Sequence, residues 1–317
     1  MVIPNWNSLQ HLARCLGSLE SAGSSQEIEL LVVDNGSADG SVEFLERERV
    51  PHVALPENTG FAAAVNLGAS RTGADSILVL NADTVVEPGG VARLLAALEA
   101  DSALGGVQPL ILQLDANGGG EEAARVYSAG QSLTRDGRGF EEGAGLIRQP
   151  EHLVASEPFG VCGAACLLRR ELFSELGGYD ENYVSFCEDV DLNVRARIAG
   201  WRFATVPEAV VRHVGNATWQ AGFADPGAEN SRLVARNRLA TQIKFMPATS
   251  IPRIAAVEAG ALARSVARRR FAATAKGKLE ALRRLPALRG ERRRLAAGGD
   301  LSAARAWLGA APRPREG

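Results

Sequence analysis

Cysteine is scarce in this sequence: 317 residues include 4 cysteines, with no Cys-x-x-Cys spacing and no histidine cluster beside them. A disulfide framework and a cysteine-ligated zinc site are therefore not expected, and we predict packed, reduced thiols. No apolar run reaches the roughly 18 residues that a membrane-spanning helix needs, and no signal-peptide pattern opens the chain. We expect a cytoplasmic protein, with peripheral binding to the inner face of the cell membrane left open.

Aromatic residues are also few, at 5% of the chain, and positive charge is unevenly distributed. Residues 251–317 contain 16 Lys and Arg against 5 Asp and Glu, so the first 250 residues are acidic. Apolar residues such as Ile254, Val257 and Leu262 recur there at helical spacing. Two interpretations remain open: helices packed on the main domain, or a basic amphipathic surface for anionic lipid headgroups. Nucleic acid is not an expected partner, because few aromatics are available for stacking and no recognised module is present.

Strands and helices alternate over the first half of the chain. Apolar runs at Glu29–Val33, Val53–Leu55 and Ile77–Leu80 each stop at polar residues, and a helical pattern follows each one. A further strand is expected at Leu104–Leu112. This alternation predicts parallel βαβ units in an α/β fold with a mostly parallel, doubly wound sheet.

Polar side chains stand where these strands end. Asp34-Asn35-Gly36-Ser37, Asn58-Thr59-Gly60 and Asn81-Ala82-Asp83 follow the three runs in turn. Ligands of open α/β sheets bind beyond the carboxyl ends of the strands, so we expect these tips to converge. A carboxylate there is a candidate ligand for a hard divalent cation. The alternative is that these Asx residues only form turns or cap helices.

The chain becomes irregular after the expected fourth strand. Residues 113–150 are rich in Gly, Glu and Arg, which predicts a long excursion, either a hairpin or a mobile flap. Small residues around Cys162 and Gly163 favour close approach of the backbone to a ligand or another strand. Two short strands are expected at 201–206 and 209–211.

A pair of carboxylates, Glu188 and Asp189, begins a helix that Gly200 closes. The helix N-terminus tends to keep such groups ionised, as a proton acceptor requires. The alternative is an ordinary set of first-turn charges. Asp191 and Arg195, four residues apart, are expected to pair on the same helix face. Another helix is predicted over 231–245.

These motifs occur together and in order, and in this the chain resembles the inverting, nucleotide-sugar-dependent glycosyltransferases of family 2, which have the GT-A fold. Gly177-Gly178-Tyr179-Asp180, Gly200-Trp201 and the basic tail are similar to its bacterial rhamnosyltransferase-like branch. The resemblance implies a GT-A domain over 1–245, with a nucleotide-binding half at about 1–112 and an acceptor half at about 155–245. Residues 246–317 would form a basic α-helical extension.

The resemblance also implies the roles of individual residues. Asp189 is the expected catalytic base, with Glu188 orienting the acceptor or replacing it. Asp83 and His213 are the expected ligands of Mg²⁺ or Mn²⁺, although an amide, Asn81, stands where the family's DXD motif has its first carboxylate. The expected nucleotide-sugar-binding residues are Asn5, Asn7, Asp34, Asn35, Asn58, Gly60, Asn66, Asn81, Ala82, Asp83, Cys162, Gly163 and Arg236.

The function implied is sugar transfer from a dTDP- or UDP-sugar to a glycan or polyprenyl-lipid-linked acceptor in bacterial cell-surface polysaccharide synthesis. L-rhamnose from dTDP-L-rhamnose is the expected donor sugar, with a UDP-hexose or UDP-galactofuranose as the alternative. Nucleotidyl transfer is disfavoured, because Asn5-Trp6-Asn7 does not supply a Gly-rich loop with a basic residue. An inactive nucleotide-sugar-binding or membrane-scaffold protein is the alternative from another class, motivated by Asn81 and the very short first strand.

Overall fold

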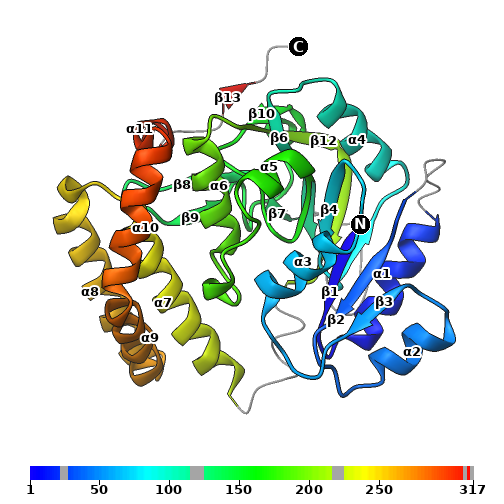
Figure 1. Cartoon of the computed structure of the whole chain (residues 1–317), viewed down its shortest axis with the longest axis horizontal. Coiled ribbons are helices and arrows are strands. Elements are labelled where there is room, and N and C mark those ends of the chain that lie inside the picture. The colour runs from blue at the N-terminus through cyan, green and yellow to red at the C-terminus, as the bar shows by residue number, and fades with distance from the viewer. Residues whose placement is uncertain (22–27, 115–124, 216–224, 310–312, 315–317) are drawn as a thin grey trace.

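A single mixed sheet forms the centre of the computed structural model, which describes residues 1–21, 28–114, 125–215, 225–309 and 313–314 (Figure 1). Its strands are β1 (Val2–Asn5), β2 (Leu31–Asp34), β3 (His52–Ala54), β4 (Ser76–Leu80), β5 (Thr84–Val86), β6 (Leu104–Gln113), β7 (Val126–Ser128), β11 (Ala165–Arg169) and β12 (Arg202–His213). They lie in the order β3-β2-β1-β4-β11-β6-β12-β5, and β7 pairs with β6 beside this path.

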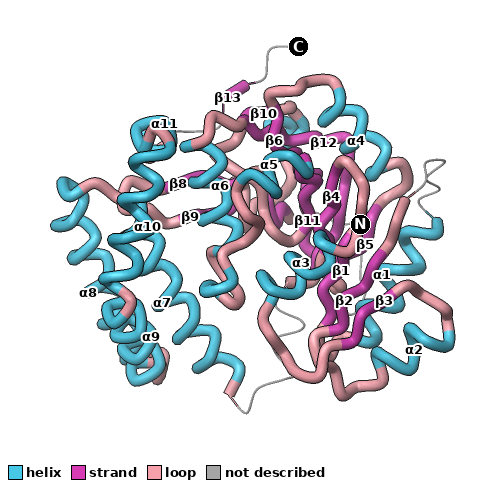
Figure 2. Tube along the Cα trace, in the orientation of Figure 1, coloured by secondary structure: helices cyan, strands magenta, loops and turns pink. Residues whose placement is uncertain are grey.

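Helices cover both faces of the sheet (Figure 2). Because side chains alternate along a strand, β4 divides its apolar residues between two cores. Leu78 and Leu80 belong to one core, and Ile77 and Val79 belong to the other. The helices that supply these cores are α1 (Leu9–Ser21), α2 (Ser41–Arg47), α3 (Phe61–Ser70), α4 (Gly90–Glu99), α5 (Arg170–Glu175) and α6 (Glu188–Ile198). This explains why the strands read as continuous apolar runs.

The α/β fold class predicted from the sequence is confirmed, with differences in detail. β1 pairs in parallel with both β2 and β4, and β2 pairs in parallel with β3. β6 and β12 are also parallel. β11 runs antiparallel to both of its neighbours, β4 and β6, so the sheet is mixed. The expected strands at 201–206 and 209–211 are one strand, β12, with an irregularity between Val206 and Val210. β5 was not predicted, because three residues are too short to show a period.

Part of the irregular excursion is a hairpin, one of the two forms expected. β8 (Gln131–Leu133) and β9 (Gly139–Glu141) pair antiparallel, while residues 115–124 lie outside the described part of the chain. Gln131 also exchanges two backbone hydrogen bonds with Gly160, at 3.0 and 3.1 Å. The hairpin is thereby held against the segment that leads into β11.

The C-terminal region is helical and packs on α7 (Pro226–Phe245), which begins five residues before the predicted start. Asp225 caps α7, since its side chain accepts a hydrogen bond from the Ala228 N–H, and Pro226 occupies the first turn. The remaining helices are α8 (Ile251–Ala267), α9 (Phe271–Arg283), α10 (Leu285–Gly298) and α11 (Leu301–Arg305). α9 approaches α7 closely, because a Cβ at Gly277 would lie 2.1 Å from the Arg232 carbonyl oxygen.

A buried lysine ties this region to the sheet domain. The Lys244 Nζ of α7 lies 2.7 Å from an Asp191 oxygen of α6, 3.2 Å from Asp180 and 3.1 Å from Glu291 of α10. Asp191 also pairs with Arg195 at 2.6 Å, which confirms the pair predicted from their spacing. Removing one partner of such a buried network leaves an uncompensated charge, so these residues act structurally.

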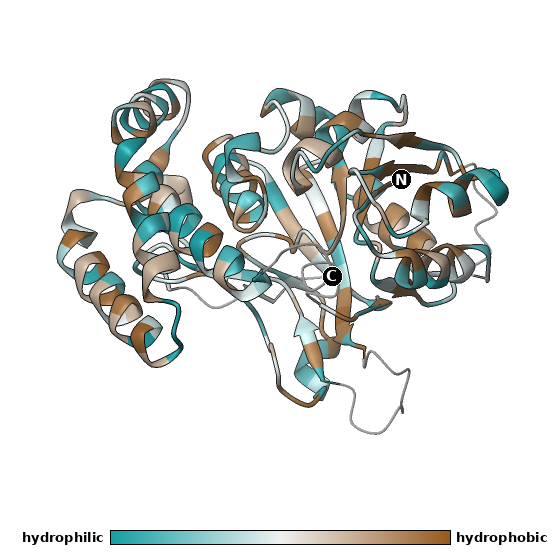
Figure 3. Ribbon diagram, turned by 90° about the horizontal axis from the view of Figure 1, so that it is seen from below, coloured by the Kyte–Doolittle hydropathy of each residue, from teal (hydrophilic) through white to brown (hydrophobic). Residues whose placement is uncertain are grey.

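Apolar and polar residues are interspersed along the tail helices (Figure 3). Within the described ranges, no helix combines the length and apolar character that crossing a bilayer requires.

Candidate active site

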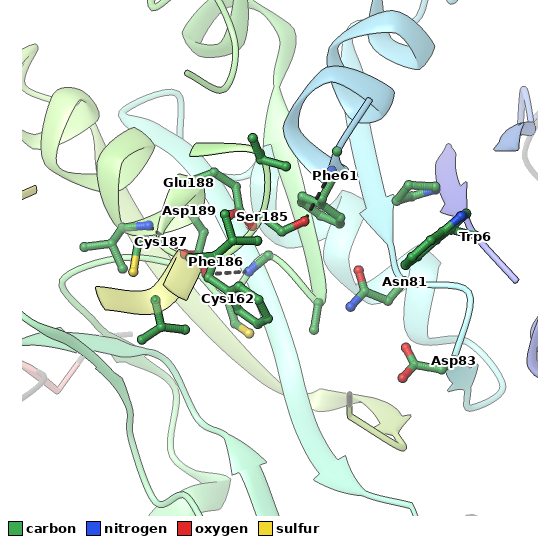
Figure 4. A pocket seen from close by; sticks show the side chains of 18 of the residues that line it. Trp6, Phe61, Asn81, Asp83, Cys162, Ser185, Phe186, Cys187, Glu188 and Asp189 are labelled. Carbon is green, nitrogen blue, oxygen red and sulfur yellow. Dashed lines mark hydrogen bonds between the residues drawn. The ribbon is translucent and has the colours of Figure 1, made fainter. Parts of the chain in front are cut away.

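The ends of several strands open into one cavity of about 560 Å³. Asn81 and Asp83 lie on one side of it with Trp6, and Glu188 and Asp189 lie on the other (Figure 4). The predicted site residues that line it are Asn5, Asn35, Asn58, Gly60, Asn81, Ala82, Asp83, Cys162, Gly163, Glu188, Asp189 and His213. Residues far apart in the sequence therefore share one cavity.

Asn35 connects the two loops that were expected to hold a nucleotide. Its Nδ2 donates to Asn58 Oδ1 and to the Gly60 carbonyl, both at 3.0 Å, while its Oδ1 accepts from the Thr59 N–H at 2.8 Å. Every polar atom of the Asn35 side chain is thus used within the protein. Asn35 shapes this end of the cavity, and Asn58 is the more exposed of the two.

Gly60 permits a close contact between this loop and the segment before α6. Its φ is +96°, and a Cβ there would lie 2.7 Å from the carbonyl oxygen of Val184. The same oxygen accepts from the Ala62 N–H at 3.1 Å. This N–H lies in the first turn of α3 and has no partner within the helix, so the Val184 carbonyl satisfies it. The close approach predicted for Gly60 therefore joins two parts of the protein.

The second side of the cavity holds a carboxylate paired with a histidine. Asp83 Oδ1 lies 3.0 Å from His213 Nε2, and both side chains are 3% exposed. Asp83 Oδ2 accepts from the Gly215 N–H at 3.2 Å, and the Asn81 amide lies 3.3 Å from His213 Nε2. Burial alone would raise the pKa of Asp83, but the hydrogen bond and charge of His213 lower it overall. Asp83 is thus suited to remain anionic.

Within the described residues, two polar atoms beside this pair lack a hydrogen-bond partner. They are Asn81 Oδ1 and His213 Nδ1. A buried acceptor without a partner is costly, which indicates a place for a ligand or water. A carboxylate, an imidazole nitrogen and an amide oxygen form a donor set that suits Mn²⁺ or Mg²⁺. The residues present therefore fit the expected cation.

Asp189 lies on the opposite side with its carboxylate oriented by the backbone. Oδ2 accepts from the Gly163 N–H at 3.1 Å and Oδ1 accepts from the Val190 N–H at 2.7 Å. Burial raises the pKa of Asp189 in spite of these hydrogen bonds. A raised pKa brings a carboxylate nearer to the value that suits a proton acceptor at neutral pH.

The turn before α6 is unusual in its backbone. Val184, Phe186 and Cys187 have positive φ values of 64°, 70° and 64°. Such residues cost energy and persist where the surroundings over-determine them, often at functional sites. Asn237 of α7 supplies part of that support, since its Nδ2 donates to the carbonyl oxygens of Ser185 and Phe186. The turn delivers Glu188 and Asp189 to the cavity.

Glu188 itself is buried, and burial together with the Asp189 charge raises its pKa well above the ordinary value. One of its oxygens, Oε2, has no partner among the described residues.

Four residues predicted to bind the nucleotide-sugar lie outside the cavity lining. Asp34 lies behind Asn5, whose Nδ2 donates to it at 2.8 Å. Asn7 Oδ1 accepts from the Ala38 N–H at 2.8 Å. Asn66 joins α3 to Tyr179 through hydrogen bonds to both of its backbone polar groups, each 2.9 Å long. The Arg236 guanidinium donates to the carbonyl oxygens of 182 and 183. In this structure their polar groups serve contacts within the protein.

The cavity residues that were not predicted include Tyr127, Gln131 and Glu141, from β7, β8 and β9. They lie in the excursion at 113–150, whose composition shows no secondary-structure period. Only an alternating pattern of hairpin strands could have indicated them in the sequence. Tyr127 packs edge-on against His213 with ring centroids 4.5 Å apart. Glu141 lies beside Asp189.

The fold is the GT-A fold of solved glycosyltransferase structures. The solved structure of GalNAc-T7 with UDP, GalNAc and Mn²⁺ is similar with a TM-score of 0.55 and 17% identity, over 74% of this chain and 47% of that one. The mannosyltransferase PcManGT of Pyrobaculum calidifontis with GDP-Man and Mn²⁺ gives a TM-score of 0.51 and 18% identity, over 96% and 85%.

The sequence profile described as "Glycosyl transferase family 2" matches residues 1–177, and the chain belongs to this family. It is 35% identical over 226 residues to the N-acetylglucosaminyl-diphospho-decaprenol L-rhamnosyltransferase of Mycobacterium tuberculosis, covering 64% of this chain and 71% of the relative. An N-acetylglucosaminyltransferase of Mesorhizobium japonicum is 29% identical over 231 residues, 68% of this chain and 50% of the relative. The predicted family and its rhamnosyltransferase-like branch are confirmed, and the protein is a glycosyltransferase.

Proposed function

We propose that this enzyme transfers a sugar with inversion from a nucleotide-sugar to a hydroxyl of a lipid-linked glycan acceptor. The observation that carries the proposal is the position of Asp83 with His213 on one side of the cavity and Asp189 on the other. Inversion needs one displacement at the anomeric carbon, with the leaving diphosphate and the incoming hydroxyl on opposite faces of the sugar. A carboxylate on each side suits these two tasks.

In this scheme Asp189 takes the proton of the acceptor hydroxyl while the hydroxyl oxygen attacks the anomeric carbon. The bond from that carbon to the diphosphate oxygen breaks, and the electron pair leaves with the diphosphate. The Gly163 and Val190 N–H groups hold the Asp189 carboxylate in one orientation, so the base is positioned before the acceptor arrives.

Asp83, His213 and Asn81 would hold a divalent cation, Mg²⁺ or Mn²⁺. When bound, the cation would stabilise the negative charge that builds on the diphosphate. Asn35, Asn58 and Asp34 remain the proposed nucleotide end of the site. Asp34 would act either through Asn5, whose amide donates to it, or directly after Asn5 has moved aside.

The proposed donor is dTDP-L-rhamnose and the proposed acceptor a polyprenyl-diphosphate-linked sugar. Support comes from the 35% identical mycobacterial relative, whose name specifies an L-rhamnosyl group and a decaprenyl-diphosphate-linked N-acetylglucosamine. A UDP-hexose is the alternative donor.

A thermal-shift panel of dTDP-, UDP- and GDP-sugars, each with and without Mn²⁺ or Mg²⁺, tests the donor. A ligand that binds only the native state raises the melting temperature, and we expect the largest rise with dTDP-L-rhamnose and a cation. Transfer assays with that donor, followed by NMR of the product's anomeric configuration, test inversion. An enzyme that binds the donor but forms no product with any lipid-linked acceptor would support the inactive-binder alternative.

We also propose that the tail helices lie on an anionic membrane face, where such an acceptor resides. On α9, Phe271, Leu279 and Leu282 are 51%, 48% and 51% exposed and recur at helical spacing. Lys276 and Arg283 of the same helix supply positive charge. An exposed apolar face beside cations is typical of helices that rest in the headgroup region.

Because α9 packs on α7, deleting the tail would damage the domain, and point variants are the better test. The double variant Leu279→Ser and Leu282→Ser should sediment less with vesicles containing anionic lipid. Leu153→Ser, at a residue 43% exposed outside the tail, is the matched control and should sediment as the wild type does. Equal sedimentation of all three proteins would contradict the membrane proposal.

A further inference from the structure

Glu141, at the end of β9, meets Asp189 in the cavity although the two residues come from different parts of the chain. Ligand atoms of Glu141, Cys162 and Asp189 all lie within 4.8 Å of one another. Gln131 of β8 joins the two carboxyl groups, because its Nε2 lies 3.1 Å from Glu141 Oε1 and 3.1 Å from Asp189 Oδ2. The hairpin therefore brings a second carboxyl group to the proposed base.

The orientation of the Gln131 amide follows from its other contacts. Asn193 of α6 lies 2.9 Å from the Val161 carbonyl oxygen, which can only accept, so the Asn193 atom facing it must be Nδ2. The same Nδ2 lies 2.8 Å from the Gln131 side chain, whose facing atom must then be the acceptor Oε1. The Gln131 Nε2 is consequently left with one hydrogen for each carboxyl group.

Further contacts fix Glu141 in place. Ser128 of β7 lies 2.6 Å from Glu141 Oε2, and Gly139, two residues earlier in β9, is packed so tightly that a Cβ would lie 2.5 Å from a Val190 methyl group. The hairpin is thus seated on the first turn of α6, where Asp189 is found.

We propose that Glu141 is a positioning residue for the base: held by Gln131 and Ser128, it forms a carboxyl pair with Asp189 and strengthens Asp189 as a proton acceptor. This inference rests on the proposed role of Asp189. Its physical basis is the repulsion between the two negative charges. This repulsion is relieved when Asp189 takes the proton of the acceptor hydroxyl, so proton uptake by Asp189 is favoured.

Burial is the largest influence on the pKa of Glu141 and of its neighbours Cys162 and Tyr127. Burial raises the pKa of Glu141 to about 7, and the Asp189 charge contributes to the rise. Burial also raises the pKa of Cys162 well above its ordinary value, as it does for Tyr127. A cation bound by this cluster would need Cys162 as a thiolate, a form that its raised pKa disfavours. The Glu141–Asp189 pair loses its last proton near neutral pH.

The test is the pH dependence of kcat for Glu141→Gln, measured from pH 5 to pH 9 with saturating donor and acceptor. In the wild type we expect kcat to rise through about pH 7 as Glu141 ionises. In Glu141→Gln this rise should move to lower pH, and the plateau should fall about tenfold because the base is weaker. Glu141→Asp keeps the charge and should keep the rise near neutral pH.

Glu142→Gln is the matched control, because Glu142 is the next residue in the chain and lines a different cavity. Its profile should match the wild type. If the rise of kcat in Glu141→Gln keeps the wild-type pH midpoint, the proposal is overturned, whatever the maximal kcat. A merely structural residue would lower kcat without shifting that midpoint. An unchanged midpoint in Glu141→Gln together with loss of transfer in Asp189→Asn would contradict this inference and leave the proposed function intact. Full turnover in Asp189→Asn would instead remove the proposed function.

Discussion

Two carboxylates, the buried Asp83 and the half-buried Asp189, face the same cavity in different electrostatic surroundings. Asp83 is paired with His213, which lowers its pKa, whereas Asp189 lies beside Glu141 and has a raised pKa. Burial raises the pKa of both groups; the His213 hydrogen bond and charge outweigh burial at Asp83, whereas the hydrogen bonds to Asp189 do not outweigh it. A carboxylate that stays ionised suits a cation, and a carboxylate that binds a proton more readily suits a base.

The largest effect is expected at the base. Asp189→Asn removes the proton acceptor but keeps the shape of the side chain, so transfer should fall about 100- to 10,000-fold. Donor binding, measured by calorimetry, should stay close to that of the wild type. If the variant turns over at the wild-type rate, Asp189 is not the base.

The opposite side of the cavity should respond through the metal. Asp83→Asn removes the negative charge that would hold the cation, so activity at a fixed Mn²⁺ concentration should fall about 10- to 100-fold. A Mn²⁺ titration of activity should show a higher half-saturating concentration, and the melting temperature of the apo protein serves as the folding control. An unchanged Mn²⁺ requirement would remove Asp83 from the metal site.

A smaller effect should appear in stability, which reports on Glu141 without any substrate. A carboxyl group whose pKa rises from 4.5 to about 7 on folding binds more protons in the folded state between these values. Its stabilising contribution is therefore present at low pH and is lost as the pH rises through this window. We expect the free energy of unfolding of the wild type to fall between pH 5 and pH 8 relative to that of Glu141→Gln. Parallel curves for the two proteins would contradict the raised pKa.

The smallest effect is expected from adding a charge. Asn81→Asp places a second carboxylate beside Asp83, which should lower the half-saturating Mn²⁺ concentration a few-fold, since carboxylates attract hard cations. Measuring activity at limiting Mn²⁺ would detect this gain. A loss of activity there would mean that the Asn81 amide has a specific contact with the donor.

Some of the site could be predicted because its residues follow short, regular strands. Asn81 and Asp83 end the run Ile77–Leu80, and Glu188 and Asp189 begin a helix closed by glycine, so local pattern and sequence order located them. Strand ends in a parallel sheet meet at one edge, which made their convergence a fair expectation.

Other parts of the site could not be predicted from local pattern. The excursion at 113–150 has no apolar period that singles out Glu141, and its hairpin is defined by pairing across a turn. Asn66 and Arg236 were expected at the nucleotide-sugar site from the family resemblance, and in the structure their hydrogen bonds join segments more than 50 residues apart. Such pairings depend on which distant groups happen to be neighbours in the folded chain.

The sequence by itself determined the α/β architecture, the succession of polar strand ends and the family, because these depend on periodicity and on residue order. Only the tertiary structure decided the partner of each carboxylate: a histidine for Asp83, and a second acid for Asp189. Electrostatic interactions depend on distance and burial, and neither quantity can be read from separation along the chain. The chemical character of each acid was therefore settled by folding.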